Sequence, residues 1–390
     1  MTVTELSNFD KKCTGCSACA NVCPVNAIQM NENKEGFFYP FVDSSRCISC
    51  ERCLGVCVVN TENLPKDNFI KCYSYQGPDE VRKISSSGGA FYALAQAVLE
   101  QNGVVHGAAY NSKLIGVNHC STEDVPLENL LRSKYVQSQI DMDYRKVRTE
   151  LDTGRCVLFA GTPCQVYGLK KYLKKDYENL ITMDFVCHGV PSPGFFRSMV
   201  LEYGKSECAT VTDVTFREKD FGWRTQVIKF YFSNGNIKTF RSKNYFYYYY
   251  FLRNMTIRKS CFFCHMPENH CSDITVMDYW HTKSDDGKGL SACVTNTEKG
   301  DAVLRDACAG ALNEIQVESL ANCFIPHDTI GAYRRYYHMR NRFMSHYTHC
   351  GIKLLLHRYD FLYRTTISFL GFLASIAGNT KKHIKKLRSK

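Results

Sequence analysis

The sequence predicts three parts: an α+β ferredoxin-like N-terminal domain over residues 1–66, an α/β domain over 67–330 and a basic helical C-terminal tail over 331–390. Two closely spaced cysteine runs predict the first part, and an alternation of strand-like and helix-like segments predicts the second. An amphipathic stretch followed by lysines predicts the third. With 390 residues, 44% of them hydrophobic, the chain has enough apolar material for more than one core.

The two cysteine runs predict a pair of [4Fe-4S] clusters. Both read C-x2-C-x2-C-x3-C, with Pro24 after the first and Val58 after the second. In two-cluster ferredoxins the fourth cysteine of each run binds the other cluster. We therefore assign one cluster to Cys13, Cys16, Cys19 and Cys57, and the other to Cys47, Cys50, Cys53 and Cys23. Zinc usually takes cysteines in two separated pairs, and disulfides need an oxidising compartment, so the spacing favours iron-sulfur clusters over both. Such clusters transfer single electrons.

The formal net charge of +11 is confined to the end of the chain. Residues 331–390 contain thirteen Lys and Arg against the single acid Asp360, so the rest of the chain has a net charge of −1. A global basic field for nucleic acid is absent, and the aromatic run Tyr245–Phe251 is more typical of a buried segment than of a base-stacking platform. The first twelve residues lack an apolar signal region, so a cytoplasmic protein with reduced cysteines is expected.

Each predicted element follows from local pattern. In the N-terminal domain, Gly36–Asp43 is expected to form a short strand and turn. Beyond Val81 the sequence alternates between helix and strand, which favours a mostly parallel sheet. Its predicted elements are a helix over 90–101, a strand over 103–110, a helix over 142–153 and a buried strand over 156–160. A hairpin over 226–241 follows from Asn234-Gly235, because Asn-Gly supplies the positive φ angles of a tight turn.

Three motifs outside the cysteine runs point to a cofactor. Ser85-Ser86-Ser87-Gly88-Gly89 precedes a helix, where backbone N–H groups and the helix dipole can hold a phosphate, although a plain capping turn has the same composition. Gly161–Gln165 follows the buried strand, at the edge where α/β sheets bind ligands. The third motif is Cys261-Phe-Phe-Cys264, followed by Cys271–Trp280.

Together with Asp184–Pro193, and in this order, these segments resemble the coenzyme F-420 hydrogenase/dehydrogenase beta-subunit family, which is related to hydroxymethyl-chlorophyll reductase. The resemblance covers about residues 8–282 when the N-terminal domain is included. One departure is Met277, where relatives commonly have glycine before Asp278. Members bind FAD and at least one [4Fe-4S] cluster, so the resemblance implies that the second part is an α/β flavin-binding domain.

The resemblance also implies site residues. The candidates for the flavin site are Ser87, Gly88, Gly89, Gly161, Thr162, Pro163 and Gln165. A third [4Fe-4S] cluster is expected on Cys164, Cys187, Cys261 and Cys264, because each lies in a matching motif and a cubane needs four thiolates. Zinc is the alternative there, since His265, His270 and Cys271 surround the Cys261 pair. His188 and Asp278 are the candidate proton donors, although His188 can instead bond a cluster sulfur and Asp278 can cap a turn.

The resulting prediction is an FAD-dependent iron-sulfur oxidoreductase that passes electrons from its clusters through flavin to a small organic substrate or a deazaflavin coenzyme. The alternative is an electron-transfer subunit of a larger dehydrogenase or hydrogenase-like complex, with no organic substrate of its own. Ferredoxin, reduced deazaflavin and a nicotinamide remain open as donors, because no G-x-G-x-x-G motif marks a separate dinucleotide site.

The tail is expected to dock on an acidic partner or on the inner membrane surface. Phe369, Phe372, Leu373 and Ile376 share one helical face, and six Lys and Arg follow between 381 and 390. The apolar stretch is shorter than the ~20 residues that a membrane crossing needs. A helix packed on the core of the protein is the alternative interpretation.

Overall fold

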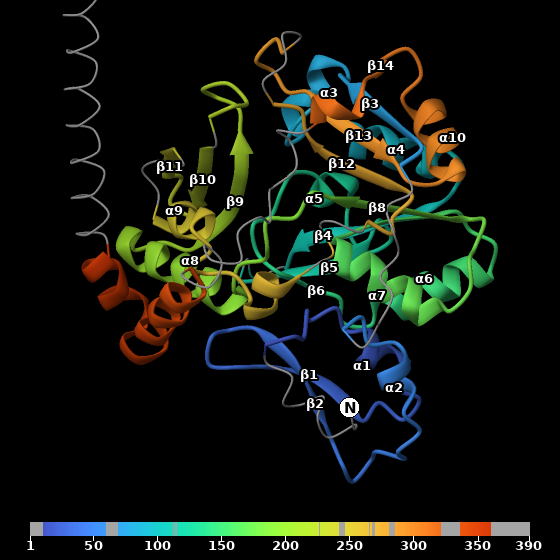
Figure 1. Cartoon of the computed structure of the whole chain (residues 1–390). Coiled ribbons are helices and arrows are strands. Elements are labelled where there is room, and N and C mark those ends of the chain that lie inside the picture. Colours follow the sequence, from blue (N-terminus) through green and yellow to red (C-terminus); the bar gives the residue numbers. More distant parts are fainter. Residues whose placement is uncertain are drawn as a thin grey trace, which may run out of the picture.

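The computed structural model describes residues 11–59, 69–111, 113, 115–225, 227–241, 246–264, 266, 270–280, 285–320 and 336–359. Figure 1 shows a central sheet flanked by helices, a smaller sheet to one side and the N-terminal module below both. The predicted boundary near residue 66 lies outside the described residues, as do residues 360–390 of the predicted tail.

The N-terminal module contains two cysteine-bearing segments, each with a short helix, around a small hairpin. The helices are α1 (Ala18–Val22) and α2 (Arg52–Gly55). Strands β1 (Ile28–Glu32) and β2 (Phe38–Val42) pair antiparallel, with Ile28 opposite Val42. β2 confirms the strand predicted within Gly36–Asp43. The residues that precede α1 and α2, Ser17 and Glu51, both adopt left-handed backbone angles, so the repeat in sequence is also a repeat in conformation.

The central sheet of the described chain has nine strands in the order β14-β3-β13-β12-β8-β7-β4-β5-β6. Their bounds are β3 (Lys71–Tyr75), β4 (Val104–Tyr110), β5 (Val117–Ser121), β6 (Ser138–Gln139), β7 (Val157–Ala160), β8 (Leu180–Phe185), β12 (Ile274–Asp278), β13 (Ser291–Thr295) and β14 (Leu312–Glu314). Only the pairs β12-β8, β8-β7, β7-β4 and β5-β6 are parallel. The prediction of a mostly parallel sheet is therefore wrong: the centre is parallel, but a short connection turns β5 back on β4, and β3, β13 and β14 form an antiparallel edge.

Helices cover both faces of this sheet. Their bounds are α3 (Asp79–Ile84), α4 (Ala90–Glu100), α5 (Leu127–Leu130), α6 (Asp143–Asp152), α7 (Pro163–Leu173) and α10 (Glu298–Ala307). Leu158 of β7 packs in a core with α4 and α10, whereas its neighbours Val157 and Phe159 pack with α6 and α7. This alternation is expected of a strand buried on both faces, and α4 and α6 confirm the predicted helices.

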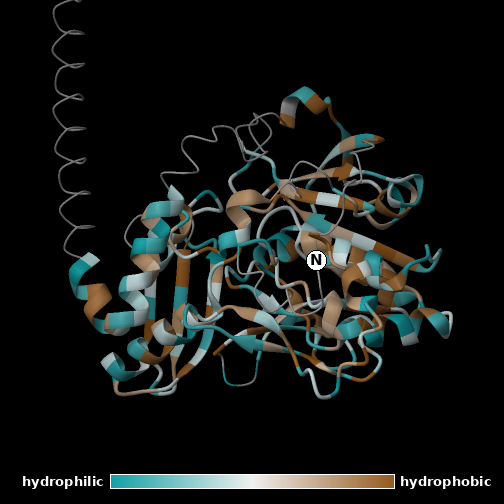
Figure 2. Cartoon of the chain, turned by 60° about the horizontal axis from the view of Figure 1, so that its bottom comes forward, coloured by the Kyte–Doolittle hydropathy of each residue, from teal (hydrophilic) through white to brown (hydrophobic). Residues whose placement is uncertain are grey.

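A second sheet, in the strand order β11-β10-β9, lies to one side of the central sheet (Figure 1). It comprises β9 (Val211–Glu218), β10 (Val227–Phe232) and β11 (Ile237–Arg241), which confirms the predicted hairpin, with Gly235 at a φ of 85°. It packs against α8 (Pro193–Glu207) and α9 (Phe246–Leu252), whose aromatic side chains are mostly buried as expected. Figure 2 shows hydrophobic residues concentrated along the strands.

The first part of the predicted tail belongs to this core. Residues 336–359 are helical, and Phe343, Met344 and Leu355 are buried in the same cluster as α8 and α9. Short 3-10 helices occur at Lys259–Phe263 (η3) and Val317–Leu320 (η5). Among the described residues, no helix is long and apolar enough to cross a membrane.

The N-terminal module is docked on the body by buried polar contacts. α1 packs against α6 and α7. Arg145 of α6 donates to the carbonyls of Asn21 at 2.8 Å and Cys23 at 2.9 Å, and these two hydrogen bonds hold the segment of the first cysteine run against α6. On the other side, Arg340 donates to both carboxylate oxygens of Glu35, at 2.7 and 2.6 Å. The cysteines of the module are thereby held at a fixed place beneath the central sheet.

Candidate functional site

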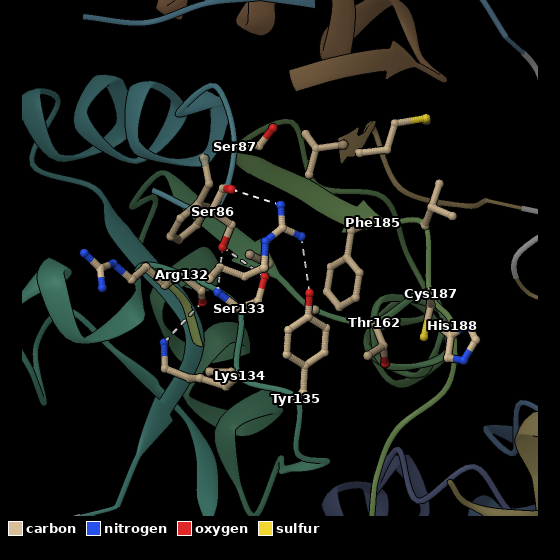
Figure 3. Close-up of a pocket in the computed structure, with 18 of the residues that line it drawn as sticks. Ser86, Ser87, Arg132, Ser133, Lys134, Tyr135, Thr162, Phe185, Cys187 and His188 are labelled. Atoms are coloured by element: carbon tan, nitrogen blue, oxygen red, sulfur yellow. Dashed lines mark hydrogen bonds between the residues drawn. The ribbon is translucent and has the colours of Figure 1, made fainter. Parts of the chain in front are cut away.

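A cavity of about 540 Å³ lies where strands of the central sheet end and the β9 sheet begins. Residues that follow β7, β8 and β12 line it, and this is the edge at which α/β sheets bind ligands. Figure 3 shows a polar side, with Ser86, Ser87 and residues 132–135, facing Phe185, Cys187 and His188 across the space. The volume and the mixed lining are those of a site for a sizeable organic cofactor.

The serine turn is held by two cations, Arg217 of β9 and Lys219 just after that strand. Arg217 donates to the carbonyl of Ser86 at 3.2 Å, and Lys219 donates to the carbonyl of Ser87 at 2.8 Å. The Ser86 hydroxyl lies 2.9 Å from the Ser133 hydroxyl, which joins the turn to the 132–135 segment. With these carbonyls directed to β9 and the N-terminus of α4 directly following, the turn is suited to bind an anionic group.

Two of the predicted flavin-site residues do not line the cavity. A Cβ atom on Gly88 would lie 2.2 Å from the Tyr75 carbonyl oxygen, so the glycine is required by close packing against β3 rather than by a ligand. Pro163 is buried as the first residue of α7, where its missing N–H costs no hydrogen bond. Ser87, Gly89, Gly161, Thr162 and Gln165 do line the cavity.

The Gly161–Gln165 loop is a capping box that places Cys164 in the first turn of α7. Thr162 is the N-cap, and its backbone N–H donates to Gln165 Oε1 at 3.0 Å. Gln165 Nε2 in turn donates to Ser138 Oγ at 3.0 Å. The Thr162 hydroxyl lies 3.2 Å from Cys164 Sγ. Gln165 therefore orients the Gly161–Gln165 loop, while the Thr162 hydroxyl contacts the sulfur of Cys164.

The eight N-terminal cysteines fall into two groups. Cys23, Cys47, Cys50 and Cys53 line one small hollow, and Cys50 is exposed. Burial raises the pKa of Cys19, and the thiols of Cys16, Cys13 and Cys57 raise it further, followed by Cys53 with the smallest effect of the four. Each group thus takes three cysteines from one run and one from the other. Buried thiols with raised pKa values stay protonated until a metal displaces the proton, which suits a cluster site.

The structure brings the other four predicted cysteines together from three elements. Cys164 is the second residue of α7, Cys187 follows β8, and Cys261 and Cys264 lie in and just after η3. Burial raises the pKa of Cys187, and the thiols of Cys261, Cys164 and Cys264 contribute to the rise. Burial also raises the pKa of Cys16 to about 12, with Cys164 its strongest thiol neighbour. This third cysteine set therefore adjoins the N-terminal group that contains Cys16.

The zinc alternative involves His265, His270 and Cys271. His270 Nδ1 lies 2.9 Å from both carboxylate oxygens of Asp184, which Thr275 also bonds, and a metal-ligating histidine commonly makes the same contact to a carboxylate. Across the described residues, no three Cys, His, Asp or Glu side chains converge on a single metal ion. A cubane does not need such convergence, because its four thiolates bind four different irons. His265 lies outside the described residues.

The two predicted proton donors differ in position. His188 lines the cavity directly after Cys187, and its ring contacts Phe251 edge to face at 5.2 Å between centroids. Asp278 also lines the cavity, but both of its oxygens accept hydrogen bonds from Arg217, at 2.8 and 3.0 Å. The ion pair therefore holds the Asp278 carboxylate against β9, whereas His188 lies beside a cysteine of the third predicted set.

Sequence reasoning missed three cations of the site. They are Lys134 and Arg217, which line the cavity, and Arg258, which is fully buried beside Cys13. Arg258 stands three residues before Cys261, and that nearness to a candidate ligand was the only signal for it in the sequence. Lys134 and Arg217 lie in no motif, and only the tertiary structure places them at the site.

Two family models match the chain. Residues 154–319 match the C terminus of the coenzyme F420 hydrogenase/dehydrogenase beta subunit, and residues 12–61 match a 4Fe-4S dicluster domain. Among solved structures, a chain of the F420-reducing [NiFe] hydrogenase complex from Methanosarcina barkeri is similar at 16% identity and a TM-score of 0.44, over 72% of this chain and 93% of that one. No curated protein matches.

Between them, the two family matches contain all twelve of the predicted cluster cysteines. The dicluster domain contains all eight N-terminal cysteines, which makes this an iron-sulfur protein of the electron-transfer type. The second match contains Cys164, Cys187, Cys261 and Cys264. The chain is thus similar to the coenzyme F420 hydrogenase/dehydrogenase beta-subunit family over residues 154–319, and it has a 4Fe-4S dicluster domain at residues 12–61.

Proposed function

We propose that the protein is a flavin-dependent iron-sulfur oxidoreductase that delivers electrons from its N-terminal clusters to a substrate in the cavity. The observation that carries this proposal is the position of Cys187, which belongs to the third cysteine set and also lines the cavity. A cluster held by that set would lie between the N-terminal clusters and any cofactor in the cavity. The exposed Cys50 marks the group at which an external donor would deliver electrons.

The residues of the cavity suit FAD. The serine turn, backed by Arg217 and Lys219, is placed to hold the pyrophosphate at the N-terminus of α4. Phe185, Phe251 and Trp280 supply apolar and aromatic lining on the other side. Bound flavin would supply the conversion between single electrons and a two-electron reduction. His188 is placed to donate a proton to the substrate, and a small organic molecule or a deazaflavin coenzyme is the proposed acceptor.

Metal analysis of anaerobically purified protein tests the third cluster. Wild type is expected to carry about twelve irons and one FAD. Cys261→Ser should lower the iron by about four, whereas the matched control Cys271→Ser should leave it unchanged, because Cys271 lies outside the proposed set. Loss of zinc with unchanged iron in Cys261→Ser would overturn the proposal.

A second function, that of an electron-transfer subunit within a larger complex, has support from the matched family, which is described as a beta subunit. The two functions differ in what the isolated chain can do. Reduction of a soluble acceptor by the purified protein, with reduced ferredoxin as donor, supports an enzyme in its own right. Activity that appears only when a co-purifying protein is added supports the subunit.

A further inference from the structure

Arg258 is a fully buried arginine at the contact between the N-terminal module and the body. It is the N-cap residue of η3, and its backbone N–H donates to the carbonyl of Val190 at 3.0 Å. Its own carbonyl accepts the N–H of Cys261 at 3.1 Å. The backbone of Arg258 is thus part of the turn that positions one cysteine of the third set.

The side chain of Arg258 reaches the first cysteine run. Nε donates to the Cys13 carbonyl at 2.7 Å, and Nη2 lies 3.6 Å from Cys13 Sγ and 2.9 Å from the Phe38 carbonyl. Nη1 donates to Gln137 Oε1 at 3.1 Å, and the Tyr39 ring stacks on the guanidinium at 4.0 Å. A hydrogen bond from a charged donor therefore ends on the sulfur of a proposed cluster ligand.

The charge of Arg258 has no carboxylate partner among its hydrogen-bond acceptors in the described chain. Those acceptors are three neutral oxygens and the Cys13 sulfur. Arg340 makes the contrast clear: it is equally buried and also lies over the Phe37 ring, but it has both oxygens of Glu35. A buried unpaired cation is costly, so the natural counter-charge for Arg258 is an anionic cluster with its thiolates.

We propose that Arg258 tunes the reduction potential of the cluster held by Cys13, Cys16, Cys19 and Cys57, and links that cluster electrostatically to the third cysteine set. A hydrogen bond to a ligating sulfur and a nearby positive charge both favour the form with one more electron, so Arg258 raises the potential. The carbonyl of Arg258 also accepts the N–H of Cys261 at 3.1 Å, so the same residue contacts both cysteine sets.

Arg258 donates to a cysteine sulfur of the first N-terminal group, whereas Arg145 donates to the carbonyl, not the sulfur, of Cys23 in the second group. The first cluster is therefore expected to be the better electron acceptor of the two. Electrons delivered near Cys50 would then be drawn inward, toward the cavity. The effect on the Cys13 cluster needs only the dicluster domain, whereas the link to the third set rests on the proposed function.

Potentiometric titration of the full-length, iron-replete protein, followed by EPR, tests the role of Arg258. Arg258→Gln removes the charge, so the equilibrium constant for reduction of one N-terminal cluster should fall at least tenfold. Its midpoint potential should then fall by about 59 mV or more, for a one-electron step. Arg258→Lys keeps the charge but loses the several N–H donors of the guanidinium group, so a smaller fall in midpoint potential is expected. Arg340→Lys is the matched buried control and should leave all midpoints unchanged.

The outcomes separate this inference from the proposed function. Unchanged midpoints in iron-replete Arg258→Gln would overturn the inference, even if the protein carries twelve irons. A wild-type protein with eight irons would remove the third cluster, but the fall in the Cys13 cluster would still be expected. If Arg258→Gln does not retain its iron, Arg258→Lys decides, and a wild-type midpoint in that variant would count against the hydrogen bond to Cys13.

Discussion

Arg217 and Asp278 form a two-fold ion pair in the wall of the cavity, with N···O distances of 2.8 and 3.0 Å. The arginine lies on β9 and the aspartate at the end of β12, so the pair joins the two sheets that enclose the site. The same guanidinium bonds the Ser86 carbonyl and lies 5.5 Å from the centre of the Trp280 ring. Arg217 therefore contacts three parts of the cavity lining: Asp278 of β12, the serine turn at Ser86 and the ring of Trp280.

Asp278→Asn should destabilise the protein rather than remove a catalytic proton. The substitution leaves the nearly buried Arg217 without its counter-charge, and breaking such a pair costs about 3 kcal/mol in the free energy of unfolding. Urea denaturation under anaerobic conditions measures this loss. Lys146→Gln is the control, because it breaks an exposed pair with Asp124 and should cost less than about 1 kcal/mol. Normal stability with abolished turnover would instead make Asp278 the proton donor.

The features that the sequence predicted correctly depend on neighbouring residues. The cysteine spacing, the helices α4 and α6 and the β10-β11 hairpin each follow from a pattern within a few residues. The antiparallel edge was missed because it pairs Lys71 with Thr295, and no local pattern carries that register. Arg258 and Cys13 are 245 residues apart. Gly88 was assigned to the cavity because a glycine-rich turn looks the same whether a ligand or a strand approaches it.

The basic residues from 381 to 390 are predicted to bind an anionic membrane surface or an acidic partner protein. Because Phe343, Met344 and Leu355 belong to the core, a truncation should follow Tyr359 rather than cut within residues 336–359. The full chain is expected to float with anionic liposomes at low salt and to be released at high salt, since each basic residue near the headgroups contributes roughly 1 kcal/mol. The truncated chain should not float. A full-length variant with Gln at the six basic positions from 381 to 390 should behave like the truncation, and flotation of that variant would rule out an electrostatic contact.

A buried triad on β4 and α6 should make stability fall at alkaline pH. His106 Nδ1 lies 3.0 Å from Asp143, and Nε2 lies 2.6 Å from Glu150. Burial alone would lower the pKa of His106, but the two carboxylates raise it to about 9. The imidazolium is therefore retained in the folded state above its unfolded pKa of about 6.5.

The contribution of this triad is complete below about pH 6.5 and is lost as the pH rises through about 9. His106→Gln removes the titrating group, so the difference in free energy of unfolding between wild type and variant should shrink from pH 6 to pH 10. Chemical denaturation at pH 6, 8 and 10 measures it. A difference that is constant across this range would show that folding does not shift the pKa of His106, and a difference that grows with pH would show that the folded protein holds His106 neutral.

Lys134 should make the binding of an anionic cofactor depend on pH near neutrality. Lys134 is one of the residues that line the cavity, and its ammonium group donates to the Leu131 carbonyl at 2.7 Å. Burial lowers its pKa to about 7, and the nearby groups Cys120 and Asp213 offset this only in part. An anionic ligand favours the charged lysine, so affinity should be greatest below pH 7 and should fall above it, by up to about tenfold per pH unit.

Fluorescence titration of flavin-stripped protein with FAD, from pH 6 to pH 9, measures this dependence. Lys134→Met should bind FAD weakly and with no slope, because the group that takes up the proton is gone. Lys134→Arg should bind well across the whole range, since a guanidinium stays charged. Lys175→Met is the control, because Lys175 is an exposed residue away from the cavity and should reproduce the wild-type profile. A wild-type profile as flat as that of Lys134→Met would mean that Lys134 does not contact the bound anion.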